Sequence, residues 1–352
     1  MHWTREIIEE FLIKRPSDMK VANLLNQIKA KYLEEKGESV SLTEEEVSAY
    51  TQFYMPTNSK KLEFIWQQLD PNVKEEISSL PLVDFGCGPG TYLWAAASVG
   101  IKGPFYGIDS SGPMLAQAKA LGTGLFPSLD FKFSVTDKDI PFDEPKTLLF
   151  GNAINELGVP QALKIIERIN PKYLIFIEPG TSKVFKEILK LRSALKEMTF
   201  EVHYPCASLE HACPVEGRIK DEREDWCHQV LREVPHPSIE RIGQMARMDR
   251  KVQPYIGHVY ELAGKNLREE STARFVRFLN ESKFAFNWEV CLVNDGKQSI
   301  FEFEIPKKNL DKKTQKLFKK LSIGHEMTYS VLKVLKDNKL RASVNLRGLD
   351  GN

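Results

Sequence analysis

Three glycines at alternate positions, Gly86, Gly88 and Gly90, lie between an apolar run and an alanine-rich stretch. Glycine lets the backbone turn tightly and lets a ligand approach it closely, because it has no Cβ atom. The first backbone NH groups of a helix that follows such a loop can also bind the ligand. The pattern therefore predicts a buried strand, a glycine loop and a helix that together hold a nucleotide-like cofactor.

The spacing of these glycines limits which cofactor they bind. It agrees with the dinucleotide fingerprint only at the first two glycines, and it lacks the Gly-Lys-Ser/Thr ending of a P-loop. Asp84 precedes the loop and completes the pattern Asp-x-Gly-x-Gly-x-Gly. That pattern resembles motif I of the class I S-adenosylmethionine (SAM) methyltransferases. The resemblance implies that Asp84, Gly86, Gly88 and Gly90 bind SAM, with the loop against its methionine end.

A second carboxylate, Asp109, ends the short apolar run that begins at Phe105, about 20 residues beyond the loop. In doubly wound sheets an acid at this place accepts hydrogen bonds from the ribose hydroxyls of the cofactor. The alternative is that Asp109 only caps the helix that begins near Ser111. The glycine loop and this acid together favour SAM binding.

Polar residues follow three further predicted strands. Asp137 comes after the third strand, where a carboxylate can meet the adenine amino group. Asn152, Asn155 and Glu156 follow the fourth strand, where methyltransferases place the groups that face the transferring methyl, so they are the catalytic candidates. Glu178 follows the fifth strand. The alternative for each residue is an ordinary helix cap or loop position.

Cysteine and histidine are concentrated between residues 203 and 236, which hold three of the five cysteines and four of the seven histidines. Cys206, Cys213 and Cys227 lie among charged residues rather than apolar ones. Thiolates gathered in a polar segment predict a zinc or an iron–sulfur site. The alternative is three unrelated small hydrophobic side chains.

The fourth ligand of this predicted site has two candidates. A nearby histidine, His211 or His228, would complete a Cys3His zinc site. Cys291, in an apolar run predicted to be a strand, would instead complete a set of four thiolates. Cys87 is excluded as a ligand, because it lies inside the glycine turn where a cluster would collide with the cofactor.

Seven lysines fall within fourteen residues from position 307 to position 320. Such a run is usually a solvated helix face, but it is also the one basic concentration that could follow a phosphate backbone. The residues predicted to contact RNA are Lys307, Lys308, Lys312, Lys313 and Lys316.

The elements that must position these residues alternate between strand and helix. Strands are predicted at 81–86, 104–109, 130–135, 146–151 and 172–178, which indicates a parallel α/β sheet with right-handed crossovers. Further strands are predicted near 258–263, 274–279, 284–293 and 299–305, with a hairpin turn at 294–297.

The predicted domains are a helical cap over 1–75, a SAM-binding core over 76–205, a Cys/His-rich cluster-binding insertion over 206–254, strands completing the core and supplying the fourth cysteine over 255–305, and a basic segment over 306–352. Within the cap, Pro56 is expected to end one helix before another begins near Leu62.

Composition excludes some classes of protein. The 352 residues, 42% of them hydrophobic, suffice for one or two domains, and a net charge of +1 indicates no strongly charged partner by itself. No apolar run approaches the roughly 20 residues of a membrane span. The first ten residues lack a signal-peptide core, and their acids argue against a mitochondrial transit peptide, so a cytoplasmic protein is expected. A monomer is favoured.

Several separate stretches together resemble a methyltransferase-like small-subunit ribosome protein family, known from mitochondrial ribosomes and from bacteria. The stretches that carry the resemblance are Tyr54–Thr57, Asp84–Thr91, Asn155–Leu157, Glu178–Thr181, Pro205-Cys206, Cys213-Pro214, Asp225–His228, and Val290-Cys291 ahead of Asp295–Lys297.

The resemblance implies a class I SAM-methyltransferase fold and a 4Fe–4S cluster on Cys206, Cys213, Cys227 and Cys291. It also implies a partner, the RNA of the small ribosomal subunit. Two roles remain open. One is methylation of that RNA, and the other is a non-catalytic role in assembling the subunit, with SAM and metal structural. In a eukaryote the resemblance would place the protein in the mitochondrial matrix.

Overall fold

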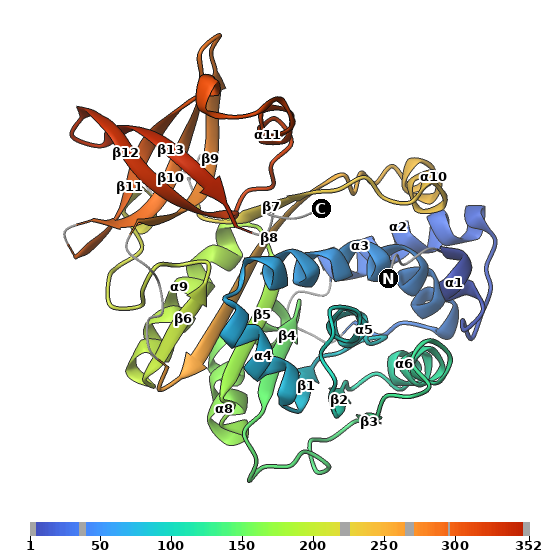
Figure 1. Ribbon diagram of the computed structural model, residues 1–352. Helices are drawn as coiled ribbons and strands as arrows, with labels where there is room; N and C mark the ends of the chain where they lie inside the picture. Colours follow the sequence, from blue (N-terminus) through green and yellow to red (C-terminus); the bar gives the residue numbers. More distant parts are fainter. Residues whose placement is uncertain (1–4, 35–39, 219–225, 265–270, 295, 348–352) are drawn as a thin grey trace. The chain divides into compact units, whose positions relative to one another are not determined.

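The computed structural model describes residues 5–34, 40–218, 226–264, 271–294 and 296–347. Figure 1 follows the chain from blue to red. The chain forms two compact units. The first unit comprises Met1–Trp66, Pro71–Glu178 and Glu233–Val252, and the second comprises Gln67–Asp70, Pro179–Arg232 and Gln253–Asn352.

A parallel sheet is the centre of the first unit, and its strands have the order β3-β2-β1-β4-β5. Its strands are β1 Leu82–Phe85, β2 Phe105–Ile108, β3 Phe131–Ser134, β4 Thr147–Gly151 and β5 Tyr173–Pro179. The five predicted strands are therefore confirmed. The order reverses between β1 and β4, and ligands of open α/β sheets bind where the strand order reverses.

The central strands are continuous apolar runs rather than alternating ones. β1, β4 and β5 are buried along nearly their whole length, as expected when helices cover both faces of a parallel sheet. The helices of this unit are α1 Arg5–Glu9, α2 Asp18–Glu34, α3 Glu44–Gln68, α4 Pro71–Ser79, α5 Thr91–Ser98, α6 Gly112–Leu125, α7 Ile154–Leu157, α8 Val159–Ile169 and α10 Pro237–Ala246. Helix α5 packs on β1, α6 packs on β3, and α10 packs on α2.

Helix α3 corrects one expectation, because it runs without interruption through Pro56. Proline removes one backbone donor, and it usually kinks or ends a helix. Next to the proline, the hydroxyl of Thr57 donates to the Phe53 carbonyl oxygen at 3.0 Å. Most side chains around Pro56 are buried, and their packing outweighs the local preference of proline.

The second unit contains three strands that follow helix α9 and then a five-stranded barrel. Strand β6 pairs with β8 antiparallel, and β7 also pairs with β8. The elements are α9 Ser182–Glu197, β6 Phe200–Tyr204, η1 Glu216–Arg218, β7 Gln229–Arg232, β8 Val252–Leu262, β9 Thr272–Glu281, β10 Ala285–Asn294, β11 Lys297–Pro306, η2 Lys307–Asn309, α11 Lys312–Phe318, β12 Glu326–Lys336 and β13 Lys339–Leu346.

The barrel closes in the strand order β10-β11-β13-β12-β9, drawn orange to red in Figure 1. Its interior holds a cluster of buried aromatic side chains, among them Phe275, Phe286, Trp288, Phe303 and Phe318. Strands β8 to β11 were predicted. Strands β12 and β13 were not, because β12 is exposed along most of its length and β13 is mostly half-buried, so neither has a strong alternation of apolar and polar residues. Residue 295 of the predicted hairpin turn lies outside the described residues.

Candidate cofactor site and cysteine cavity

The register of the parallel sheet brings three loops to one edge. Phe85 of β1 pairs with Ile108 of β2 and with Phe150 of β4. The residues that follow these strands, Gly86 and Asp109 among them, therefore emerge side by side at the carboxyl ends of the strands. This is the edge at which the sequence predicts the cofactor.

The glycine loop has the backbone conformation that its sequence predicts. Gly86, Gly88 and Gly90 have φ angles of +78°, +54° and +84°. A Cβ atom on Gly86 would lie 2.8 Å from the Cβ of Ala153, and one on Gly90 would lie 2.6 Å from the indole of Trp94. A Cβ on Gly88 would meet nothing nearer than 3.9 Å. Gly88 thus leaves its side of the loop open to a ligand.

Asp109 stabilises this loop from the neighbouring strand. Its Oδ2 accepts a hydrogen bond from the Gly88 backbone NH at 2.8 Å, and its Oδ1 accepts one from the Ser111 NH at 2.8 Å. Ser111 is itself the N-cap of α6, since its hydroxyl accepts from the Met114 NH. Asp109 therefore supports the helix start, as the alternative interpretation held, and it also links that start to the glycine loop.

Asp84 is a buried carboxylate in the middle of β1. Its side chain is 0% exposed, and neither carboxylate oxygen has a hydrogen-bond partner among the described residues. Burial raises the pKa of Asp84 well above its usual value, and the charge of Asp109 adds to the shift. A buried carboxylate without a donor is costly, so a ligand that brings a donor or a positive charge would be stabilised here.

Glu178 holds the loop that carries the catalytic candidates. Its buried carboxylate accepts hydrogen bonds from the backbone NH groups of Ala153, Ile154 and Asn155 at 3.0, 2.9 and 3.3 Å, which caps α7. With its side-chain nitrogen turned toward acceptors, Asn155 also donates to Glu178 Oε2 at 2.7 Å. Burial raises the pKa of Glu178 to about 8, although the three backbone hydrogen bonds act to lower it.

The other two catalytic candidates lie in the same loop. Asn152 has a φ of +59°, a left-handed conformation that costs energy for a residue other than glycine. Burial, together with the charge of Asp109, raises the pKa of Glu156 to about 7. Glu156 can therefore gain or lose a proton near neutral pH, which a general base requires.

Asp137 is placed differently from the other cofactor candidates. Its carboxylate forms an ion pair with Arg168, in the last turn of α8. A contact with an adenine amino group would have to compete with this pair, and that role of Asp137 stays a prediction.

Some residues near this edge were not anticipated. Helix α3 carries Tyr50, Tyr54 and Lys61, and burial lowers the pKa of Lys61 to about 7, with Arg250 adding to the shift and Glu178 opposing it. Arg250 lies over the Tyr54 ring, 5.5 Å from its centroid, and donates to Asn58 Oδ1 at 2.6 Å. The sequence offered little signal for this group, because tyrosines four residues apart on a helix are typical of a core face.

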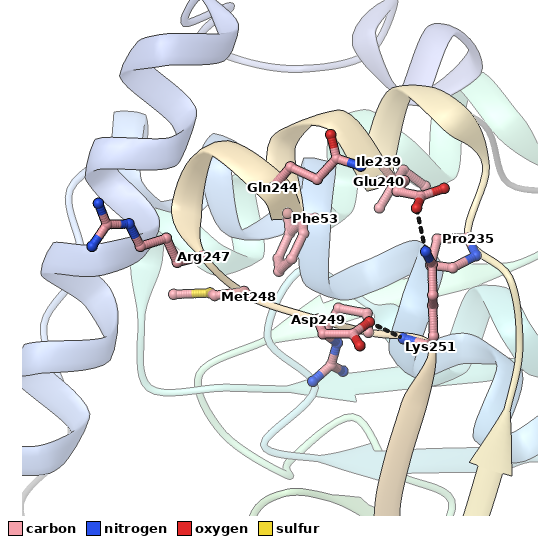
Figure 2. Close-up of a pocket in the computed structure, with 11 residues that line it drawn as sticks. Phe53, Pro235, Ile239, Glu240, Gln244, Arg247, Met248, Asp249 and Lys251 are labelled. Atoms are coloured by element: carbon pink, nitrogen blue, oxygen red, sulfur yellow. Dashed lines mark hydrogen bonds and ion pairs between the residues drawn. The ribbon is translucent and has the colours of Figure 1, made fainter.

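A cavity of about 270 Å³ lies in the first unit, beside α10. Figure 2 shows Phe53 and Met248 in its wall, Arg247 pointing away from it, and Lys251 paired with Glu240. Arg250 also lines it and so connects it with α3. None of the predicted site residues line this cavity.

The four predicted cysteine ligands converge in the second unit. Cys206, Cys213, Cys227 and Cys291 all line one small cavity of about 30 Å³, and His228 lines it too. Gln298 donates to Cys291 Sγ at 3.3 Å. His211 instead offers its backbone carbonyl oxygen to Arg192 at 2.7 Å.

The thiols share one electrostatic environment. Burial raises the pKa of Cys227 well above its usual value, and Cys213, Cys206 and Cys291 add to the shift. Burial and Cys206 likewise raise the pKa of Cys213. Among the described residues, however, no group of three or more His, Cys, Asp or Glu side chains is arranged to hold a metal ion. The thiols thus surround one space without meeting at a single point.

The predicted RNA contacts lie around η2 and α11. Lys307 Nζ is paired with Glu281 Oε1 at 2.7 Å, while Lys308, Lys312, Lys313 and Lys316 are exposed. In the part of the chain that the structure describes, no helix is long and apolar enough to cross a membrane.

Solved structures with a similar fold are SAM methyltransferases. Magnesium protoporphyrin IX methyltransferase from Synechocystis PCC 6803 is 16% identical, over 53% of this chain and 88% of that chain, with a TM-score of 0.34. A putative RNA methyltransferase from Pyrococcus horikoshii is 12% identical, over 59% and 85%, with a TM-score of 0.36. An rRNA methylase from Streptococcus thermophilus is 13% identical, over 58% and 95%, with a TM-score of 0.33.

No curated protein matches the sequence. The family model described as mitochondrial small ribosomal subunit Rsm22 matches residues 44–299, which is well over half of the chain. The match confirms the resemblance that the separate motifs indicated. With the strand order of a class I SAM methyltransferase around its glycine loop, this chain belongs to the Rsm22 family.

Proposed function

We propose that this protein binds SAM at the edge formed by β1, β2 and β4 and acts as a methyltransferase on the RNA of the small ribosomal subunit. The observation that carries the SAM site is Asp84, whose two buried carboxylate oxygens have no hydrogen-bond partner among the described residues. SAM carries an ammonium group and a sulfonium, and either positive charge would offset this buried carboxylate. The membership of the Rsm22 family supports the choice of RNA.

In this proposal, some residues at this edge bind SAM and others align the RNA. Gly88 leaves its side of the loop open, and Asp109 holds the loop in place and would use its remaining acceptor capacity for the ribose hydroxyls of SAM. When SAM is bound, its sulfonium supplies an already activated methyl group. Much of the rate then comes from aligning the RNA atom, which is the task of the Asn152–Glu156 loop. Glu156 can accept a proton near neutral pH.

We also propose that the four thiols of the second unit bind a 4Fe–4S cluster. Four cysteines line one cavity, and soft thiolates are the ligands that iron–sulfur clusters take. A four-iron cluster binds each thiolate at a different iron, so its ligands need not meet at one point as they do around a single zinc ion. Metal binding would displace the thiol protons that burial now retains.

A second candidate function is assembly of the small subunit without catalysis. It is favoured by the way in which Glu178 and Asn155 are engaged, because their polar groups hold the start of α7 rather than facing an open site. SAM and the cluster would then stabilise a protein that binds RNA. The protein would act in the cytoplasm of a bacterium or in the mitochondrial matrix of a eukaryote.

Asp109→Ala tests the SAM site. Loss of a carboxylate that holds both the loop and the ribose should weaken SAM binding about 10- to 100-fold by calorimetry, since hydrogen bonds to charged groups contribute about 1.5–3 kcal/mol. Asp130→Ala, which removes an exposed carboxylate paired with Lys132, is the matched control and should bind as the wild type does. Wild-type SAM affinity in Asp109→Ala, or an equal loss of affinity in both variants, would refute the site.

Transfer of a labelled methyl group separates the two functions. Wild-type protein is incubated with labelled SAM and small-subunit RNA or subunits, and Glu156→Gln serves as the comparison. Label in the RNA that falls with Glu156→Gln supports methylation. Retained RNA binding by Asp109→Ala, with no label from the wild type, supports assembly instead.

A further inference from the structure

The barrel of the second unit has a recognisable connectivity. Its first three strands, β9, β10 and β11, form antiparallel neighbours, β11 pairs with β13 in parallel, and β12 closes the barrel against β9. Helix α11 lies between the third and fourth strands of the barrel. A closed five-stranded barrel with this order is an OB-fold, a fold that frequently binds single-stranded nucleic acid. The family match ends at residue 299, so it does not cover the second half of this barrel.

Positive charge is concentrated in the barrel, and this excess favours the binding of a polyanion there. Residues 271–347 contain 16 lysines and arginines against eight aspartates and glutamates, whereas the whole chain has 49 against 48. The barrel is therefore strongly cationic within a nearly neutral protein, and this asymmetry is typical of nucleic-acid binding.

The usual ligand face of an OB-fold, its second and third strands, is engaged here by other contacts. Cys291 and Ile300 of that face line the cysteine cavity. Glu289, Glu302 and Glu304 are paired with Arg218, Lys339 and Arg341 respectively. RNA would therefore have to bind at another part of the barrel.

The loop between β9 and β10 meets the lysine run and forms such a surface. The Lys307 backbone NH donates to the Phe284 carbonyl oxygen at 2.8 Å, and Lys307 Nζ donates to the Ser282 carbonyl oxygen at 2.6 Å. Lys307 and Lys319 both pair with Glu281, at 2.7 and 3.2 Å. These contacts hold the two segments together, although they are separate in sequence.

An exposed aromatic ring lies in this loop between β9 and β10. Phe284 is 74% exposed, more than any other aromatic side chain among the described residues, and Lys283 Nζ lies 5.5 Å from its ring centroid. The neighbouring helix α11 is anchored by the buried Phe318, whose ring stacks on Phe286 at 5.4 Å. Its lysines consequently remain on the outside. An exposed ring beside basic side chains is the arrangement on which the bases of single strands stack.

We propose that Phe284 and the lysines of residues 307–320 form a binding surface for single-stranded RNA on this OB-fold barrel. One base stacks on the Phe284 ring, and Lys308, Lys312 and Lys316 contact the flanking phosphates. This inference deepens the proposed function and rests on it only for the identity of the RNA.

Fluorescence anisotropy of the full-length protein with a labelled single-stranded RNA oligonucleotide tests the surface. Phe284→Ala should weaken binding about 5- to 100-fold at every salt concentration, which is the usual effect of losing one stacked base. The triple variant Lys308→Gln/Lys312→Gln/Lys316→Gln should lower the salt slope of log K by about two, because each phosphate contact of a single strand contributes about 0.7. A duplex of the same sequence should bind more weakly than the single strand.

Two controls make the result specific. Phe142→Ala removes a ring that is 41% exposed in the first unit, and Lys119→Gln/Lys164→Gln/Lys190→Gln removes the same charge from exposed helix positions. Both controls should bind RNA as the wild type does. Wild-type affinity in Phe284→Ala, equal losses in the two lysine variants, or preference for the duplex would each overturn the proposal. Calorimetry of SAM binding by Phe284→Ala reports on the first unit separately, so failure of this surface is distinguishable from failure of the cofactor site.

Discussion

At the scale of single residues, the cofactor edge is defined by carboxylates that burial keeps from ionising readily. Asp84, Glu156 and Glu178 all have a pKa that burial raises above its ordinary value. Lys61 on α3 has a pKa that burial lowers to about 7. Carboxyl groups with raised pKa values beside a lysine with a lowered pKa are typical of functional sites. A purely structural core would contain apolar residues at these positions instead.

Glu178→Gln is predicted to change how stability depends on pH. A folded-state pKa of about 8 means that the folded protein holds a proton on Glu178 that the unfolded chain releases near its ordinary value of 4.5. The stability from Glu178 is therefore full below pH 4.5 and is lost as the pH rises toward 8, with each pKa unit worth about 1.4 kcal/mol at most. Glutamine keeps the oxygen that accepts from Ala153 and Ile154 but cannot ionise.

Urea unfolding between pH 5 and pH 8 measures this effect. The free energy of unfolding of the wild type should fall more steeply with pH than that of Glu178→Gln. Glu187→Gln, on the exposed face of α9, is the control and should retain the wild-type slope. Identical slopes in all three proteins would contradict a raised pKa for Glu178.

The residue types at this edge were predictable where one short motif contained them. Asp84, Gly86 and Gly88 lie within five positions of one another, and backbone geometry alone requires those glycines. Lys61 and Arg250 were not predictable, because they reach the same region from helices and loops far away in the sequence. Local patterns carry no information about such long-range packing.

At the scale of elements, the glycine loop and the start of α7 are in direct contact. Gly86 faces Ala153 so closely that a Cβ on Gly86 would lie 2.8 Å from the Ala153 Cβ. A Cβ atom is fixed to the backbone, so this clash could be relieved only by moving the Asn152–Glu156 loop away from the glycine loop. Loop and helix start thus behave as one element.

Gly86→Ala should therefore damage the site more than the fold. The positive φ alone costs about 1–2 kcal/mol for a residue with a Cβ, and the contact with Ala153 adds to this cost. We expect a drop of several degrees in Tm and a large loss of SAM affinity. Gly100→Ala is the matched control, since Gly100 has a φ of +98° and a Cβ added there would have nothing within 4 Å. It should lose similar stability from φ alone and keep its SAM affinity, and equal affinity losses in both variants would contradict the contact.

The elements themselves were largely predictable from hydrophobic periodicity. The five parallel strands appeared as apolar runs, because both faces of that sheet are buried. Pro56 misled the prediction, since the burial of most side chains around it outweighs the local preference of proline. Strands β12 and β13 were missed because β12 is exposed along most of its length and β13 is mostly half-buried, so their apolar residues alternate weakly.

At the scale of the whole molecule, the two units are interleaved along the chain. Residues 233–252 belong to the first unit, although the segments on either side of them belong to the second. The cysteines of the second unit are similarly dispersed, since three precede this excursion and Cys291 follows it. A cluster bound to all four would therefore constrain segments that are distant in sequence, which contributes folding free energy.

If the proposed 4Fe–4S cluster is bound, Cys213→Ser should remove it and loosen only the second unit. Protein purified without oxygen should show broad visible absorption with iron and sulfide, and the variant should be colourless. Hydrogen exchange should increase in residues 200–218 and 285–306 while residues 82–108 stay protected. Cys87→Ala, outside the cavity, should keep the colour. A wild type with one zinc ion and no sulfide would exclude the cluster, and colour in Cys291→Ser would exclude Cys291 as a ligand.

The parallel pairing of β11 with β13 also bears on how the chain is made. Strand β13 lies between β11 and β12, and it is the last strand of the barrel to leave a translating ribosome. Until it emerges, β11 and β12 each present an open edge, and open edges of this kind readily join the strands of other chains. A premature stop near residue 336 would therefore leave both edges exposed, so shortened products of this gene should be insoluble rather than merely less active.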